Sequence, residues 1–204
     1  MGLGRAIGRV AWASALAGAG AAIGYAALRT EAGREADEDL FKTLNAPHGP
    51  PVDRYLAGVT ELGSMYAATA AAGALALAGR RREGARALAG AGATWLLLQG
   101  VKRLVDRPRP FTADPGGTRQ LIAEPRGTSW PSSHPAVLTT FSRIAARELR
   151  VGRLGRLGLT GVDASVGASR VALGVHYPSD VASGLLIGRA VARVWPRGRS
   201  QGRR

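Results

Sequence analysis

Apolar stretches without charge alternate with short charged segments along most of the chain. The clearest stretch runs from Val10 to Leu28, with Arg9 before it and Arg29 after it. A helix needs roughly 20 apolar residues to cross a bilayer, so this stretch is long enough for one span. A signal peptide is the alternative interpretation, but the apolar run is long for one and no polar domain follows it. We therefore expect an uncleaved first span.

Five further apolar stretches follow, and the later ones are weaker candidates for membrane spans. In order they cover residues 55–79, 87–101, 135–146, 157–169 and 181–194. The last three carry internal charges, such as Arg143 and Asp163, and none of them would pass a strict hydropathy test alone. They are also compatible with core helices of a soluble protein. Ionisable groups inside a span are costly and tend to pair, so a structural ion pair between Arg143 and Asp163 is expected.

The charged junctions favour membrane spans. Arginine-rich junctions precede the first stretch, separate the second from the third and the fourth from the fifth, and follow the sixth; they contain Arg5, Arg9, Arg80, Arg81, Arg82, Arg86, Arg147, Arg150, Arg153, Arg156, Arg197, Arg199, Arg203 and Arg204. The junction at residues 31–39 is acidic instead. The positive-inside rule then predicts six spans with both termini in the cytoplasm. The basic junction at 102–134 conflicts with this pattern unless its charges have another role.

Composition agrees with a small helical membrane protein. The 204 residues are 46% hydrophobic and include 29 glycines, and small residues let membrane helices approach closely. The absence of Cys excludes a disulfide scaffold, a thiolate metal site and a Cys nucleophile. The net charge of +14 is compatible with nucleic acid or with an anionic membrane surface. Because the arginines lie between apolar stretches, we expect a lipid bilayer as partner and no nucleic acid.

These observations predict an all-α protein, a six-span transmembrane helical bundle. We expect one membrane-embedded domain over residues 1–195 and a basic, disordered tail over residues 196–204. The sequence does not predict the oligomeric state.

Three polar stretches hold most of the reactive side chains. They are Lys102–Pro110, Trp130–Pro135 and Ser169–Asp180, and in a six-span arrangement all three meet on one side of the membrane. Together they contain three cations (Lys102, Arg109, Arg170), two histidines (His134, His176) and the carboxylate of Asp180. The loop arginines Arg103, Arg107, Arg119 and Arg126 either recognise an anionic headgroup or only solvate the loop.

This set of side chains suits phosphate chemistry. Arginine holds phosphate oxygens in a bidentate fork and lysine adds a point charge. The hydroxyls of Ser132 and Ser133, with free amides at a helix start after Pro131, add further donors. One histidine can attack phosphorus while the other protonates the leaving oxygen. Asp180, four residues after His176, can orient its ring. The sequence predicts phosphoryl transfer that requires no metal and no cofactor.

The three stretches resemble the signature of the type 2 phosphatidic acid phosphatase superfamily, which also includes vanadium haloperoxidases and bacterial acid phosphatases. That signature is Lys-x6-Arg-Pro, Pro-Ser-Gly-His and Ser-Arg-x5-His-x3-Asp. Here it corresponds to Lys102–Pro110, Pro131–His134 and Ser169–Asp180, with matching spacings. Ser133 stands where the family usually has glycine. The resemblance covers roughly residues 55–195, within a single phosphatase domain.

The resemblance implies a role for each site residue. His176 would be the nucleophile that forms a phosphohistidine, and Asp180 would orient it. His134 would act as general acid for the leaving group and then as base for water. The phosphate-binding residues would be Lys102, Arg109, Ser132, Ser133 and Arg170. Membrane members of the family place this site at the outer face of a helical bundle.

The function implied is an integral-membrane phosphatase that removes a terminal phosphate from a lipid phosphate or diphosphate. Candidate substrates are phosphatidic acid, phosphatidylglycerol phosphate and polyprenyl phosphates or diphosphates. A phosphatase for soluble phosphoesters, or a haloperoxidase that binds vanadate, is disfavoured by the apolar stretches. A non-catalytic membrane protein that binds anionic lipid is the remaining alternative, and it predicts that replacing His134 or His176 changes nothing measurable.

Overall fold

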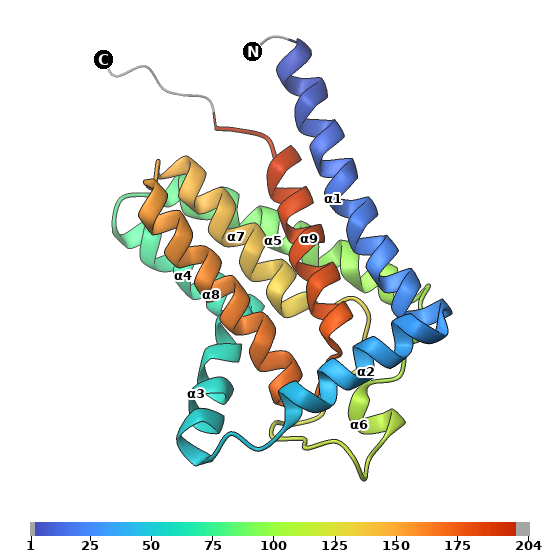
Figure 1. Ribbon diagram of the computed structural model, residues 1–204. Coiled ribbons are helices and arrows are strands. Elements are labelled where there is room, and N and C mark those ends of the chain that lie inside the picture. Colours follow the sequence, from blue (N-terminus) through green and yellow to red (C-terminus); the bar gives the residue numbers. More distant parts are fainter. Residues whose placement is uncertain (1–2, 199–204) are drawn as a thin grey trace, which may run out of the picture.

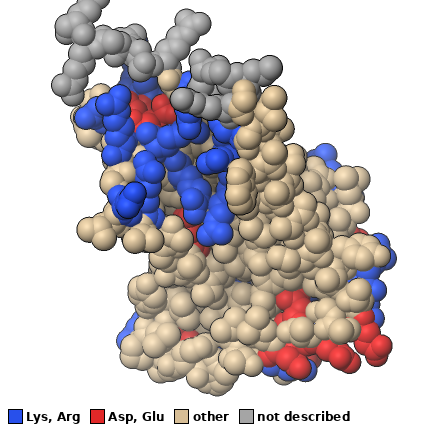
Figure 2. All heavy atoms as spheres, turned by 45° about the horizontal axis from the view of Figure 1, so that its top comes forward, with Lys and Arg blue, Asp and Glu red and all other residues tan. Residues whose placement is uncertain are grey.

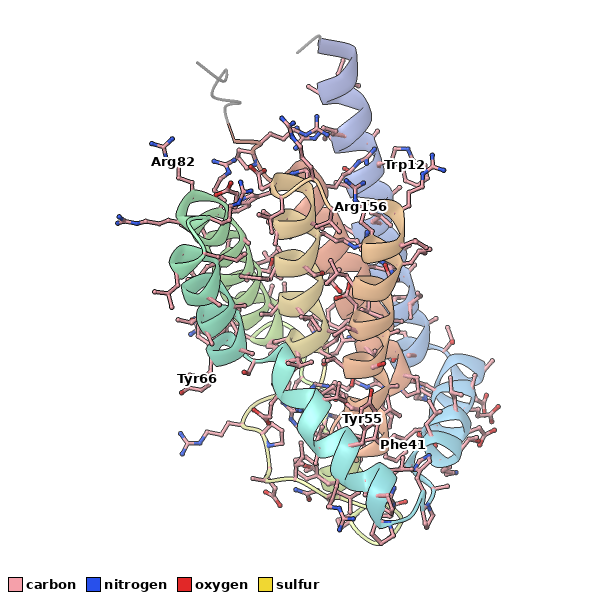
Figure 3. The ribbon with its side chains drawn as sticks, turned by 90° about the vertical axis from the view of Figure 1, so that its left-hand side faces the viewer. Trp12, Phe41, Tyr55, Tyr66, Arg82 and Arg156 are labelled. Atoms are coloured by element: carbon pink, nitrogen blue, oxygen red, sulfur yellow. The ribbon has the colours of Figure 1, made fainter. Side chains whose placement is uncertain are left out.

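A computed structural model describes residues 3–198, and over this range the chain forms helices and loops without strands. The elements are α1 (Leu3–Arg29), α2 (Glu31–Asn45), α3 (Pro50–Thr60), the 3-10 turn η1 (Glu61–Gly63), α4 (Met65–Leu77), α5 (Arg81–Lys102), α6 (Pro110–Ala113), α7 (Ser133–Glu148), α8 (Arg153–Ala172) and α9 (Pro178–Val194). The long helices run along a common direction, and α2 and α3 lie at one end of the bundle (Figures 1 and 3). The all-α prediction is confirmed.

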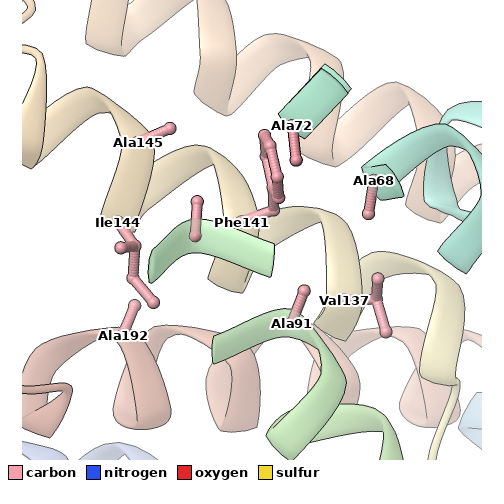
Figure 4. Packing of buried hydrophobic residues seen from close by; sticks show 9 residues of the cluster. Ala68, Ala72, Ala91, Val137, Phe141, Ile144, Ala145 and Ala192 are labelled. Atoms are coloured by element: carbon pink, nitrogen blue, oxygen red, sulfur yellow. The ribbon is translucent and has the colours of Figure 1, made fainter. Parts of the chain in front are cut away.

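Helix α7 occupies the centre of the bundle and packs against α4, α5, α8 and α9. The core around it is built mainly from small side chains, which Figure 4 shows at close range: Ala68, Ala72, Ala87, Ala91, Val137, Phe141, Ile144, Ala145 and Ala192. Gly188 lets α9 approach α7, because a Cβ there would lie only 2.5 Å from the carbonyl oxygen of Ala136. Small residues thus bring the two helices that carry His134 and Asp180 into close contact.

Helix α1 packs along α9. Ser183 on α9 donates to the carbonyl oxygen of Gly20 at 2.8 Å and accepts from Trp130 Nε1 at 3.0 Å. Within residues 3–198, α1 is the helix that is long and apolar enough to cross a membrane, over Ala6–Arg29, and most of that segment is not buried in the bundle. The first predicted apolar stretch is therefore one continuous helix with a large exposed apolar surface.

The second predicted stretch is not one helix. Residues 55–79 are divided by η1, where Gly63 lies against His134 and Val166, and Ser64 then caps α4 by accepting from the amide of Ala67 at 3.1 Å. With 13 residues, α4 is roughly 20 Å long, shorter than the hydrocarbon core of about 30 Å. The count of six spans thus stays a prediction.

Two other expectations concern charged residues. The predicted ion pair between Arg143 and Asp163 was wrong: in the described part of the chain, Asp163 instead accepts a hydrogen bond from Ser142 Oγ at 3.1 Å. Of the predicted disordered tail at 196–204, residues 199–204 lie outside the described residues.

The acidic junction after α1 forms the amphipathic helix α2. Thr30 caps it by accepting from the amide of Gly33 at 3.1 Å. Its buried side chains, Asp37, Phe41 and Asn45, are four residues apart and share one face, whereas the other acidic residues of α2 are exposed. This register places a buried carboxylate, Asp37, at the end of the bundle where the polar stretches converge.

Candidate active site

The three polar stretches meet at the end of the bundle near α2 and α3. They are the loop after α5, the first turn of α7 and the junction between α8 and α9. The backbone amide of Ser132 donates to the carbonyl oxygen of Asp180 at 3.0 Å, which joins the second stretch to the third. The predicted catalytic and phosphate-binding residues all lie in these stretches, at the ends of the apolar segments. The predicted residues therefore form one cluster.

His176 is buried between Arg109 and Asp180. Its Nδ1 lies 3.4 Å from Asp180 Oδ2, and its Nε2 lies 3.1 Å from Arg109 Nη1. A carboxylate at Nδ1 favours the tautomer with the proton on that nitrogen, which leaves a lone pair on Nε2. Burial lowers the pKa of His176 well below its usual value, against the opposing effect of Asp180. The ring is therefore neutral at pH 7, with Nε2 facing the cationic cluster.

Asp180 is fully buried and well satisfied. Its Oδ2 accepts from the amide of Tyr177 at 2.9 Å and from Ser129 Oγ, and its Oδ1 accepts from Arg107 Nη1 at 2.6 Å. Burial opposes ionisation, but the hydrogen bond with His176 and the charge of Arg107 lower its pKa to about 2. An ionised Asp180 thus holds the His176 ring in place.

Arg107 links this carboxylate to α2. Its Nη2 donates to Asp37 Oδ2 at 2.6 Å, while its guanidinium lies 4.1 Å from the centre of the Tyr177 ring. Asp37 also accepts from the amide of Ser179 at 2.8 Å. Two carboxylates on different helices are therefore bridged by one buried arginine, which fixes Asp180 behind His176.

Three cations, Lys102, Arg109 and Arg170, lie close together near His176, and none of them forms a salt bridge with a carboxylate in the part of the chain that the structure describes. Lys102 Nζ donates to the carbonyl oxygen of Thr128 at 2.6 Å, and Arg170 Nη1 donates to Thr60 Oγ1 at 3.0 Å. Burial and the nearby charge of Arg109 lower the pKa of Lys102 to about 8. Neutral oxygens hold these cations close together despite their repulsion, which leaves a strongly positive site.

Several donors at this site lack a partner. Within the described residues, the hydroxyls of Ser132 and Ser133 and the Nε of Arg170 are buried without a hydrogen bond. Both serines stand at the start of α7, where the backbone amides and the helix dipole also favour an anion. Buried donors are almost always satisfied in proteins. A bound oxyanion with several acceptor oxygens would satisfy all three.

His134 lies at the same helix start. Gly63 allows η1 to approach it, because a Cβ at Gly63 would lie 2.8 Å from His134 Cβ. Burial, with the charges of Arg170, Arg109 and Lys102, lowers the pKa of His134 to about 3. An anion bound among these cations would weaken that repulsion and raise the pKa of His134, so its protonation depends on the ligand.

A cavity lies beside the site, along α5. It has a volume of about 810 Å³ and has Lys102 in its wall, together with Trp95 and Leu96 on the preceding turns of the helix. Leu96 is 65% exposed. Lys102 therefore lies between the cationic cluster and an exposed apolar surface.

Four residues contribute to the site in ways that the sequence did not predict. They are Asp37, Thr60 and Ser129, and Arg107, which positions Asp180. Asp37 and Thr60 lie far from the motifs along the chain, and only the i, i+4 pattern of α2 marks Asp37 as inward-facing. Arg119, one of the ambiguous loop arginines, is engaged elsewhere: it binds Asp53 at 2.9 Å and the backbone and side chain of Asn45. Arg103 and Arg126 remain exposed.

Comparisons with known proteins agree with this arrangement. The family model of the PAP2 superfamily matches residues 83–204, more than half of the chain. A decaprenylphosphoryl-5-phosphoribose phosphatase from Mycobacterium tuberculosis is 41% identical over 123 residues, which cover 60% of this chain and 64% of the relative. The protein of the same name from Mycolicibacterium smegmatis is 33% identical over 137 residues, 64% of this chain and 68% of the relative. The chain thus spans just under two thirds of the first of these relatives.

Two solved structures share the fold. A transmembrane PAP2-type phosphatidylglycerolphosphate phosphatase from Bacillus subtilis superposes with a TM-score of 0.67 at 22% identity, over 92% of both chains. Aquifex aeolicus LpxE superposes with a TM-score of 0.68 at 23% identity, over 76% of this chain and 90% of that one. The helical arrangement of this chain is therefore shared with both of these structures.

Proposed function

Because this chain belongs to the PAP2 superfamily, we propose that it is an integral-membrane phosphatase that removes a terminal phosphate from a lipid-linked substrate. The observation that carries the proposal is the position of His176. Its Nε2 faces Arg109 at 3.1 Å while Asp180 contacts the opposite ring nitrogen at 3.4 Å. A neutral, oriented imidazole beside a cationic cage with unpartnered donors is suited to attack phosphorus.

In the first half-reaction, Nε2 of His176 forms a bond to phosphorus while the bond from phosphorus to the leaving oxygen breaks. Charge on the transferring oxygens is stabilised by Lys102, Arg109 and Arg170 and by the serine hydroxyls at the start of α7. His134 gives its proton to the leaving oxygen. In the second half-reaction, His134 takes a proton from water, the oxygen of that water bonds to phosphorus, and the bond to Nε2 breaks.

Binding of the substrate phosphate would favour protonation of His134, as its role as general acid requires. Without an anion, the three cations favour the neutral ring, which cannot act as an acid. A phosphate dianion offsets their charge, so His134 gains its proton when substrate is in place. Substrate binding therefore converts His134 into the protonated form that can act as general acid.

A lipid-linked substrate is favoured by the surroundings of Lys102. The cavity beside it is bordered by Trp95 and Leu96, which gives an apolar chain a surface along α5 while the phosphate enters the cage. The mycobacterial relatives act, by their names, on decaprenylphosphoryl-5-phosphoribose. We therefore place sugar phosphates on polyprenyl lipids first among the substrates, followed by polyprenyl phosphates, phosphatidic acid and phosphatidylglycerol phosphate.

The proposal includes a topology of six spans with both termini in the cytoplasm and the active site facing outward. Its support is the separation of charge: Arg82 and Arg156, from two of the arginine-rich junctions, lie at the end of the bundle opposite Phe41 and Tyr55 (Figure 3). A reporter fused after Arg204 should read out as cytoplasmic. An external signal would contradict this arrangement.

Phosphate release by the detergent-purified protein tests the proposed activity. The panel contains a polyprenyl-linked phosphosugar, a polyprenyl diphosphate, phosphatidic acid, phosphatidylglycerol phosphate and one soluble phosphoester, with a chelator present because no metal is expected to be required. We expect release from at least one lipid, abolished by His176→Ala and retained by His48→Ala, since His48 is exposed in a loop. Phosphate release that survives His176→Ala would refute the mechanism. Release from the soluble ester alone would show that the substrate is a soluble phosphoester and not a lipid.

A further inference from the structure

A second cationic cavity lies at the end of the bundle opposite His176. It has a volume of about 720 Å³ and lies between α1, α7, α8 and α9. Figure 3 shows two of its lining residues, Trp12 and Arg156, at the upper end, whereas Phe41 and Tyr55 mark the end with the active site. In Figure 2, basic side chains gather on the surface around this end. The cavity is therefore separate from the proposed active site.

The lining of this cavity carries a large excess of positive charge. Its basic residues are Arg143, Arg147, Arg156, Arg189, Arg193 and Arg197, and the one acidic residue that the structure shows in the lining is Asp163. Glu148 lies nearby but already pairs with Arg147 at 3.2 Å and with Arg86 at 3.5 Å. Protein carboxylates in the described residues thus offset only a part of the charge.

Two of these arginines are held inside the bundle with unmet hydrogen-bonding capacity. Arg143 and Arg189 each have a buried Nε without a partner among the described residues. They lie within electrostatic reach of each other and of Asp163. Neighbouring arginines that repel one another, each with a buried Nε that lacks an acceptor, are expected where an anionic ligand supplies those acceptors.

The shape of the cavity fits a ligand that enters from the membrane surface. The cavity follows α8 from Arg156 to Asp163, so it extends roughly 10 Å along the helix. Trp12 and Leu16 of α1 line one side, and Trp12 is 62% exposed. Tryptophan is favoured at the headgroup level of a bilayer, and cytoplasmic leaflets are rich in anionic lipids.

We propose that this cavity binds a phosphate-bearing anion, either the headgroup of an acidic membrane lipid or a soluble phosphate compound. Arg143 and Arg189 contact its oxygens directly, and Arg156 and Arg193 attract it at the rim. This site goes beyond the proposed phosphatase activity, because it lies at the other end of the bundle and the lining residues that the structure shows include no histidine. A phosphodiester headgroup would remain intact in it.

Native mass spectrometry of the full chain in neutral detergent tests the proposal. One arm titrates short-chain phosphatidylglycerol with phosphatidylcholine as the zwitterionic control, and a second arm titrates inorganic pyrophosphate. The test variant is Arg143→Gln with Arg189→Gln. The matched control is Arg81→Gln with Arg82→Gln, which removes two exposed arginines from the start of α5, outside the cavity.

We expect the wild type to bind phosphatidylglycerol or pyrophosphate, the cavity variant to bind it at least about tenfold more weakly, and the control to bind it normally. Dependence on Arg143 and Arg189 in the first arm identifies a lipid headgroup, and in the second arm a soluble anion. Equal weakening by both pairs of substitutions would overturn the proposal, as would binding to neither probe. If the cavity variant does not fold, the exposed rim pair Arg156→Gln with Arg193→Gln must show the same selective loss. Phosphatase turnover is not part of the readout, so failure of the proposed activity would leave this test intact.

Discussion

The two ends of this bundle both carry clustered arginines, but the side chains around those arginines differ. At the end with His176, buried Arg107 bridges Asp37 and Asp180, with contacts of 2.6 Å to each. At the opposite end, Arg143 and Arg189 line a cavity in which Asp163 is the acidic residue that the structure shows. The first end is organised by carboxylates placed behind the reactive groups. At the second end, Arg143 and Arg189 form no salt bridge with a carboxylate in the described residues, although Glu148 pairs with Arg147 and Arg86 nearby.

This difference distinguishes two uses of arginine: to fix the position of a catalytic side chain, and to attract an anionic ligand. A buried ion pair contributes little net stability, but it fixes geometry, and removal of one partner leaves an uncompensated buried charge. Catalysis requires that geometry, because His176 has to face phosphorus in one orientation. Binding of a headgroup requires mainly a positive potential and donors. The carboxylates that hold Arg107 at one end, and the lack of a salt bridge to Arg143 and Arg189 among the described residues at the other, therefore match the two roles that we propose.

The largest difference between the ends is expected from removing one arginine at each. Arg107→Ala leaves Asp37 and Asp180 buried without their shared partner and should destabilise the protein by about 3–5 kcal/mol. Arg156→Ala removes an exposed side chain and should change stability by less than about 0.5 kcal/mol. Thermal and denaturant unfolding in the same detergent would measure both.

A catalytic readout separates the positioning role of Arg107 from simple loss of fold. Asp37→Asn keeps the shape of the side chain but removes the charge that anchors Arg107. We expect it to lower kcat more than it raises KM, because Asp180 loses its fixed position while the phosphate cage stays intact. Asp39→Asn, on the exposed face of α2, serves as control. Equal effects of the two substitutions would contradict the network.

The pH dependence should also differ between the ends. The pKa of Lys102 is lowered to about 8 by burial and by Arg109, so its positive charge is present below that pH and is lost as pH rises through it. The value of kcat/KM should therefore fall above about pH 8, since this ratio reports the free enzyme. Lys102→Arg should move that decline to higher pH.

Anion binding in the arginine-lined cavity should stay constant between pH 7 and 9, because free arginine has a pKa of about 12.5 or above. Titrating phosphatidylglycerol binding beside kcat/KM over this range tests the contrast. An alkaline decline of kcat/KM that persists unchanged in Lys102→Arg would show that another group titrates.

The sequence predicted the helical class and the composition of the motif cluster because these depend on local patterns. Apolar periodicity marks helices, and fixed spacings such as His176 to Asp180 place side chains near each other within one or two turns. The break at Gly63 was missed because Glu61 was taken as a single charge inside one otherwise apolar stretch, whereas the turn follows from packing against His134. The bridge from Asp37 to Arg107 was missed because it joins residues 70 positions apart through tertiary contact. The unmet donors of Arg143 and Arg189 depend equally on how four helices assemble.

The smallest effect is expected at Ser133, which stands where the family usually has glycine. Its buried hydroxyl has no partner in the described residues, as is also true of the Nε atoms of Arg143 and Arg189 at the opposite end. Replacing it by Ser133→Gly should raise KM by less than about tenfold and leave kcat nearly unchanged, since one neutral hydrogen bond contributes roughly 0.5–1.5 kcal/mol. Arg109→Ala, which removes a cation that faces Nε2 of His176, should lower kcat/KM far more in the same assay. If Ser133→Gly lowered KM instead, the hydroxyl would crowd the phosphate rather than bind it, and the unmet donors at this end would be fewer than the structure indicates.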